Sequence, residues 1–190
     1  MRTPGIIILA AGKGTRFQQA GGEGCKLLAP YPDAAGVSRP LISLTLAQAQ
    51  RSGLPCILVT RPDAHGILQL AREAAMPVIT LNSAGSGETI AAAVRATPAW
   101  QGWLIQPGDM AWVTAEDHRR VAQALSAGLP QVRLVWQNQP GHPVGFASAW
   151  RAALGNLQGD AGARALLDPL TLTLLEAHSG VIRDADLPAD

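Results

Sequence analysis

Two glycines and two basic residues lie close together near the start of the chain. Gly12 and Gly14 tolerate backbone angles that bulkier residues resist, so successive N–H groups there can point into one concavity. Lys13 and Arg16 add positive charge at the rim of that concavity. This spacing predicts a loop that binds a polyanion, with phosphate as the natural occupant.

A buried strand is needed to hold such a loop. Residues 6–9 form an aliphatic run typical of a parallel strand that is covered on both faces, and the run ends at the small residues Ala10, Ala11 and Gly12. A dinucleotide-binding loop would need a third glycine where Phe17 stands, and the Gly-Lys-Ser/Thr of a Walker loop is absent. The loop therefore follows a different phosphate-binding pattern.

A single aspartate follows a second hydrophobic segment, about halfway along the chain. Residues 102–105 lead into Gln-Pro-Gly-Asp-Met at 106–110, where proline and glycine shape a tight turn. Mg²⁺ needs only one or two carboxylates, because water and phosphate oxygens complete its shell. Asp109 is therefore predicted to be a metal ligand; the alternative is that it only closes the turn.

Helical and strand patterns alternate along the chain around these loops. Strands are predicted at 56–60, 78–81, 103–106 and 132–137, and helices at 41–52, 64–75, 88–96 and 115–127. This alternation predicts an α/β fold with a mostly parallel, Rossmann-like sheet flanked by helices, and a site at the carboxyl ends of the strands. The chain has 190 residues, 47% of them hydrophobic, and no linker or repeat, so 1–190 is predicted to be a single domain.

Charge and cysteine content exclude some kinds of partner. The net charge is +1, with 15 basic and 14 acidic residues scattered along the chain, so neither nucleic acid nor a membrane surface is an expected partner. The first apolar stretch is too short for a signal peptide and is followed by Lys13 and Arg16, which favours a cytoplasmic protein. Cys25 and Cys56 have no CxxC partner and are expected to be thiols.

The segment 9–16, Leu-Ala-Ala-Gly-x-Gly-x-Arg, resembles the opening signature of nucleotidyltransferases that couple a nucleoside triphosphate to a phosphorylated acceptor. The resemblance implies catalytic roles for Arg16, Lys26 and Asp109, with Mg²⁺ as cofactor. Lys26 is assigned by its order in the chain, because the loop at 18–24 is longer than in relatives. The residues implied in nucleotide binding are Leu9, Ala10, Ala11, Gly12, Gly14, Asn82, Ser86 and Gly87.

The end of the chain resembles the closing segment of the same family. There, an acidic or amide residue two positions before a proline supplies a second metal contact, and Asp186 holds that position before Pro188. Asp184 is an alternative, because alternation along an extended segment puts both carboxylates on the same side. A solvated acidic tail is the other interpretation.

Two further segments resemble the molybdenum cofactor cytidylyltransferases of this family. Residues 140–146 contain Gly-His-Pro, and residues 157–164 contain Gly-Asp-x-Gly-Ala-Arg. The resemblance implies that His142, Asp160 and Arg164 bind the acceptor, and that a molybdoenzyme or a cofactor chaperone is the partner protein. A short helix beginning near Gly162 would offer N–H groups to an acceptor phosphate, whereas His142 could instead satisfy a loop carbonyl.

The choice of base follows from the first loop. Ala10-Ala11-Gly12 matches the cytidylyl branch, whereas the related guanylyltransferases usually carry Leu-Ala-Gly-Gly. The expected reaction is therefore Mg²⁺-dependent transfer of CMP from CTP to molybdopterin or molybdenum cofactor, with release of pyrophosphate. The alternatives are a guanylyltransferase, a sugar-phosphate nucleotidyltransferase, or a catalytically silent nucleotide-binding domain that acts through a protein partner. Of the five tryptophans, Trp112 is the one expected to lie near a ligand.

Overall fold

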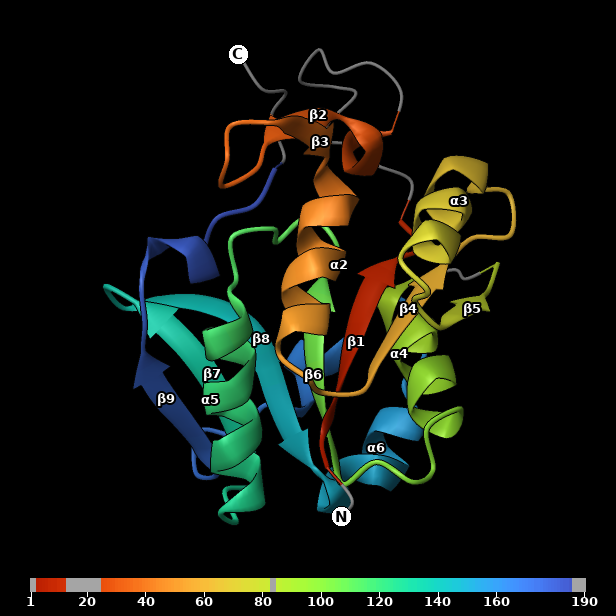
Figure 1. The fold of residues 1–190 in the computed structure, drawn as a ribbon. Helices are drawn as coiled ribbons and strands as arrows, with labels where there is room; N and C mark the ends of the chain where they lie inside the picture. Colours follow the sequence, from red (N-terminus) through yellow and green to blue (C-terminus); the bar gives the residue numbers. More distant parts are fainter. Residues whose placement is uncertain (1–2, 13–24, 83–84, 186–190) are drawn as a thin grey trace.

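The computed structural model describes residues 3–12, 25–82 and 85–185. A seven-stranded sheet, in the order β5-β4-β1-β6-β8-β7-β9, forms the centre of the molecule (Figure 1). Of these seven strands, β8 alone runs antiparallel to its neighbours. The strands are β1 (Gly5–Ala10), β4 (Cys56–Thr60), β5 (Val78–Thr80), β6 (Gly102–Pro107), β7 (Gln131–Trp136), β8 (Gln139–Ala147) and β9 (Leu172–Glu176).

Helices cover both faces of the sheet. One face packs against α2 (Leu41–Arg51), α3 (His65–Glu73) and α5 (Ala115–Ser126), and the other against α4 (Ser86–Arg95) and α6 (Arg151–Gly155). Alternation along β1 explains this: Ile6 and Ile8 point into the first core and Ile7 into the second, all three fully buried.

Short elements complete the fold near the carboxyl ends of the strands. A hairpin of β2 (Pro30–Pro32) and β3 (Ser38–Pro40) lies beyond the end of β1, at the top of Figure 1. Single-turn 3₁₀ helices are found at η1 (Lys26–Leu28), η2 (Ser148–Trp150), η3 (Ala163–Leu166) and η4 (Ser179–Val181). In the parts of the chain described, every helix is too short or too polar to cross a bilayer.

The mostly parallel α/β sheet predicted from the sequence is confirmed, but two of its strands were not predicted. In β8, Pro140 and Pro143 cannot donate to a sheet ladder, so the segment does not look like a strand. The structure accommodates them because β8 pairs with β6 only from Val144 onward, and its pairing with β7 shifts register between Arg133 and Val135. The shift in register therefore lies in the part of β8 that contains Pro140 and Pro143.

Candidate active site

The end of β1 and the turn that follows β6 are held side by side. The Gly108 N–H donates to the Leu9 carbonyl at 2.8 Å, and the buried Thr45 hydroxyl donates to the Gly108 carbonyl at 2.7 Å. A β-carbon on Gly108 would lie 3.1 Å from the Leu9 oxygen and 2.9 Å from Ile42, so glycine allows this close approach. The carboxyl end of β1 and the Asp109 turn therefore meet at the same edge of the sheet.

Lys26 and Asp109 form an ion pair at this edge, although they lie 83 positions apart in the chain. Lys26 Nζ lies 2.8 Å from Asp109 Oδ2, and the two side chains are 17% and 10% exposed. Lys26 comes from η1, just after the first loop, and Asp109 comes from the turn after β6. The structure thus brings together the lysine and the aspartate that the sequence assigned to one site.

A buried polar network between β6 and α5 stabilises the Asp109 turn. The Gln106 amide donates to the Met110 carbonyl at 3.1 Å, and Gln106 Oε1 lies 2.7 Å from His118 Nε2. Because the amide nitrogen of Gln106 is already donating, its oxygen accepts, and we assign the imidazole proton to Nε2. Burial lowers the pKa of His118 to about 4, so the ring is neutral at pH 7.

The carboxylate of Asp109 fits a hard divalent cation that arrives with phosphates. In residues 3–12, 25–82 and 85–185, no group of three or more His, Cys, Asp or Glu side chains could form a metal cage. Mg²⁺ and similar cations do not need such a cage, since one carboxylate with water and phosphate oxygens is enough. Asp184 is described and exposed, whereas the predicted second ligand Asp186 lies outside the described residues.

An aromatic pair and a further cation lie beside Lys26. The ring of Tyr31, on β2, meets the ring of Trp112 edge to face at 5.9 Å, and the Arg183 guanidinium lies 3.6 Å above the Trp112 ring. Burial raises the pKa of Tyr31, while the positive charges of Arg183 and Lys26 lower it. Arg183 therefore adds a second positive charge to the Asp109 side of the site.

The segment carrying Arg183 is held against the start of α5. Thr114 and Asp117 form a reciprocal capping box there, and the same Asp117 carboxylate lies 2.7 Å from His178 Nε2. His178 Nδ1 in turn accepts the Gly180 N–H at 3.1 Å. Sequence reasoning missed the contact between His178 and Asp117 because the two residues lie 61 positions apart; only the Thr114-x-x-Asp117 capping pattern was visible in the sequence.

Only part of the first loop is described. Ala10 and Ala11 are buried, and the Ala10 carbonyl accepts the Thr60 hydroxyl at 3.0 Å. Gly12 is exposed, its φ lies outside the left-handed region, and a β-carbon there would meet no atom of the described residues within 4 Å. The described part of the chain therefore gives neither a conformational nor a steric reason for glycine at this position. Gly14 and Arg16 lie outside the described residues.

The start of α4 packs against the turn that precedes η3. The Gly87 N–H donates to the Gly159 carbonyl at 2.8 Å, and the Ser86 hydroxyl lies 3.4 Å from the Asp160 carbonyl. A β-carbon at Gly87 would come within 2.8 Å of the Gly159 oxygen, so close packing accounts for that glycine. Asn82 is exposed in the loop that follows β5. The predicted base and acceptor segments therefore touch each other.

The three residues predicted to bind the acceptor lie on different elements. His142 is on β8 and not in a loop, and burial lowers its pKa to about 4. Asp160 is an exposed turn residue, between Gly159 and Gly162 with φ of 62° and 54°. Arg164 is exposed on η3, whose single 3₁₀ turn is the short helix expected near Gly162.

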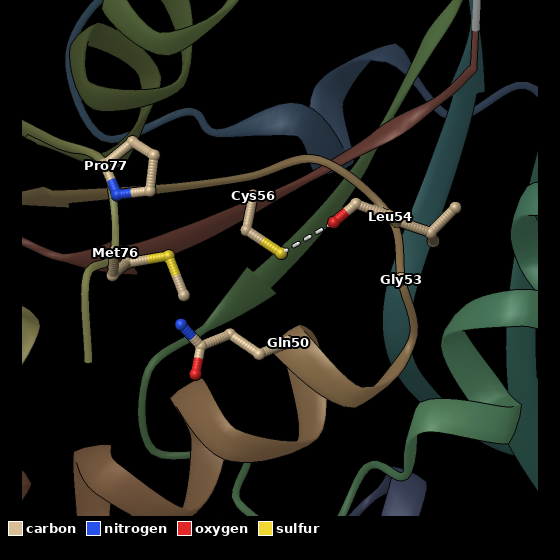
Figure 2. Close-up of a pocket in the computed structure, with 6 residues that line it drawn as sticks. All are labelled: Gln50, Gly53, Leu54, Cys56, Met76 and Pro77. Atoms are coloured by element: carbon tan, nitrogen blue, oxygen red, sulfur yellow. Dashed lines mark hydrogen bonds between the residues drawn. The ribbon is translucent and has the colours of Figure 1, made fainter.

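A separate hollow of about 280 Å³ lies at the opposite end of the sheet (Figure 2). Its lining includes the first residue of β4, and Cys56 Sγ lies 3.2 Å from the Leu54 carbonyl. Burial raises the pKa of Cys56 to about 11, so this thiol is protonated and a poor nucleophile. The lining residues are Gln50, Gly53, Leu54, Cys56, Met76 and Pro77.

Known proteins resemble this chain in sequence pattern and in fold. The model of the MobA-like NTP transferase domain matches residues 6–177. No curated protein sequence matches the chain significantly.

Similar structures cover almost the whole chain. The Rv0371c protein of Mycobacterium tuberculosis H37Rv aligns with a TM-score of 0.82 and 21% identity, over 98% of this chain and 94% of its own. A manganese complex of that protein aligns with a TM-score of 0.72 and 21% identity, over 98% and 91%. A nucleotidyl transferase from Methanothermobacter thermautotroptrophicus gives 0.76 and 22%, over 95% and 89%. The 4-diphosphocytidyl-2C-methyl-D-erythritol synthase of Anaerococcus prevotii gives 0.67 and 15%, over 96% and 92%. At these identities the likeness shows a shared fold.

Proposed function

The chain belongs to the MobA-like NTP transferase domain family, and we propose that this member transfers CMP from CTP to the phosphate of a molybdopterin-type acceptor. The observation that supports this most directly is the 2.8 Å pairing of Lys26 with Asp109 at the carboxyl ends of β1 and β6. Nucleotidyl transfer needs a cation for the phosphates and a carboxylate for a metal in one site, and the side-by-side position of this lysine and this aspartate supports such roles for them.

The proposed reaction is a displacement at the α-phosphorus of the triphosphate. An oxygen of the acceptor phosphate forms the new bond, the bond from the α-phosphorus to the β-phosphate oxygen breaks, and pyrophosphate leaves. Lys26, Arg16 and Arg183 bind the β- and γ-phosphates and balance the charge that develops on the leaving group. Because the acceptor phosphate is already an anion at neutral pH, no side chain needs to activate it as a base.

Asp109 is the residue that would hold a divalent cation, with Asp186 as the proposed second ligand. Such a cation, when bound, supplies positive charge to the phosphate oxygens of the substrate. We propose Mg²⁺ as the physiological ion. The manganese complex of the mycobacterial protein supports a divalent cation in this fold.

Preference for CTP is proposed from the first loop. The buried Ala11 carries a methyl group where Leu-Ala-Gly-Gly has its first glycine, and this methyl would leave less space for a base at the end of β1. The cytidylyl synthase among the similar structures supports a pyrimidine nucleotide. The acceptor is proposed to bind on the side of His142, Asp160 and Arg164.

A substrate panel tests the proposal. CTP, GTP, ATP and UTP are each combined with molybdopterin or with common sugar phosphates, and pyrophosphate release is measured with Mg²⁺ present. We expect CTP with molybdopterin to give the highest kcat/KM. A preference for GTP, or for a sugar phosphate, would replace the cytidylyl assignment by one of the alternative transfer reactions. Nucleotide binding without release on any acceptor would identify a silent nucleotide-binding domain.

A further inference from the structure

Arg133 is the one charged residue of β7, in which Gln131 is the only other polar side chain. Its neighbours on β7, Val132 and Leu134, are fully buried in the core that contains α5, so alternation turns Arg133 toward the opposite face. Arg133 is partly buried on that face, where it pairs across the strands with Val144 of β8. Its Nε donates to the Gly141 carbonyl at 3.0 Å, which fixes the guanidinium beside β8.

Arg164 is brought to the same place by Gln131. Gln131 is fully buried two residues before Arg133, and therefore lies on the same face of β7. Its amide donates to the Leu166 carbonyl at 2.7 Å, and its oxygen accepts the Asp168 N–H at 3.0 Å. These bonds hold η3 against the start of β7, where the charge of Arg164, together with burial, lowers the pKa of Arg133.

His142 connects this pair of arginines to the Asp109 turn. A β-carbon on Gly141 would meet Val181, which belongs to the core that contains α5, so the adjoining His142 lies on the opposite face, the one that carries Arg133. Beyond the effect of burial, the charge of Arg133 lowers the pKa of His142 and that of Asp109 raises it. His142 is therefore within electrostatic reach of both groups.

The two arginines have no acidic partner in the described parts of the chain. Within the described residues, the Arg133 side chain donates one hydrogen bond, from Nε to the Gly141 carbonyl. The Arg164 side chain makes no hydrogen bond or ion pair with any described residue. The positive charge of the exposed Arg164 disfavours the charged form of the partly buried Arg133, and an anion bound between the two guanidinium groups would offset this repulsion.

We propose that Arg133 and Arg164, with His142, form the binding site for the phosphate monoester of the acceptor, with the partly buried Arg133 as its anchor. This inference rests on the proposed function. Lys26 and Arg183 lie with Tyr31 and Trp112, whose side chains belong to the α2–α5 core, whereas Arg133 and His142 lie on the α4–α6 face. The triphosphate and the acceptor phosphate thus bind different sets of cations on either side of Asp109.

The test is calorimetric and needs no turnover. Phenyl phosphate is titrated into the full-length protein saturated with Mg²⁺ and the non-reactive analogue α,β-methylene CTP. We expect Arg133→Met and Arg164→Met each to weaken phenyl phosphate binding by about tenfold or more, because each removes charged hydrogen bonds. Arg133→Lys should weaken binding less than Arg133→Met, since it keeps the charge but loses the planar fork.

Arg72→Met is the matched control, because Arg72 is an exposed arginine on α3 whose guanidinium bonds to Gln69. It should leave phenyl phosphate affinity unchanged, and affinity for the CTP analogue should be unchanged in every variant. Arg164 is exposed, so its variant reports on binding even if Arg133→Met fails to fold. Equal phenyl phosphate affinity in wild type and Arg164→Met, or no binding to wild type, overturns the inference. If the CTP analogue does not bind wild type, the result contradicts the proposed function and not this inference. Phenyl phosphate titrated alone into the same variants then tests whether Arg133 and Arg164 bind an anion.

Discussion

The side chain of Asp109 carries most of the chemistry proposed for this protein. It is buried, and its Oδ2 accepts from Lys26 Nζ at 2.8 Å. The turn that carries it is fixed by hydrogen bonds that the backbone carbonyls of Gly108 and Met110 accept. Replacement by asparagine keeps its size and shape but removes its charge.

Asp109→Asn should therefore lower metal-dependent pyrophosphate release on the order of a hundredfold or more, without loss of folding. The measurement is kcat at saturating Mg²⁺, with circular dichroism as the check on folding. Asp63→Asn, in an exposed loop, is the control. Equal turnover of wild type and Asp109→Asn would remove this carboxylate from the site.

Arg183 is expected to bind the phosphates of the nucleotide. Its guanidinium lies 3.6 Å above Trp112 on the Lys26 side of the site, so we expect it to contact phosphates and not the base. Arg183→Gln should weaken CTP binding several-fold and leave cytidine binding unchanged. Binding titrations with both ligands decide this, and an equal loss for both would show that Arg183 acts through the fold.

At the scale of elements, the turn after β6 depends on α5 through His118. Because the pKa of His118 is lowered from 6.5 to about 4 in the folded protein, the unfolded chain binds more protons between these two values. The free energy of unfolding should therefore fall as the pH drops from 6.5 to 4, by roughly 3 kcal/mol from this group. His142, lowered in the same direction, adds to the loss.

Chemical denaturation of wild type and His118→Leu between pH 7 and pH 4.5 measures this contribution. The variant should be less stable at pH 7, because Gln106 loses its partner, but its stability should depend less on pH. His65→Leu, at an exposed position on α3, is the control and should keep the wild-type slope. The same slope in His118→Leu as in wild type would contradict this account.

The elements also show what could be predicted from the sequence. Strands such as β1 and β4 are continuous apolar runs, and α2 ends close to the predicted position, because burial on one or both faces determines those patterns. By contrast, β8 contains prolines that pair only at an irregularity, and β9 is half exposed. Neither strand has the regular pattern that identifies a strand without its neighbours.

Prediction of the site was limited for a related reason. Lys26 and Asp109 follow recognisable loops, and the fold brings them together. Tyr31 comes from a segment with no motif, and in the closing segment the resemblance singles out Asp186 and not Arg183. Only the folded chain shows that both residues contact Trp112. Arg133 did leave a signal, a charge within a mostly apolar strand, but its meaning depends on knowing which face of the sheet it occupies.

At the scale of the whole molecule, the sheet places the two proposed phosphate sites on either side of one turn. The antiparallel strand β8 lies between β6 and β7, so His142 lies beside the carboxyl end of β6 while Arg133 follows on the next strand. Both substrates can therefore be bound at the same time, and the nucleotidyl group can pass directly from one to the other without a covalent bond to the protein.

Steady-state kinetics with both substrates varied should accordingly show a sequential mechanism, with intersecting lines in double-reciprocal plots. Configuration at the α-phosphorus should be inverted by the single displacement, which a chiral phosphorothioate analogue of CTP measures. Parallel lines together with retained configuration would require a covalent nucleotidyl-protein intermediate and would contradict the proposed reaction.

The ion pair between Lys26 and Asp109 also has a consequence for the order in which ligands bind. A divalent cation that takes the Asp109 carboxylate competes with an ammonium group only 2.8 Å away. A triphosphate relieves that competition, since its oxygens offer Lys26 another partner. Metal and nucleotide should thus bind with positive thermodynamic coupling, each raising the affinity of the other by the same factor. The protein would then take up its cation mainly as the metal–nucleotide complex.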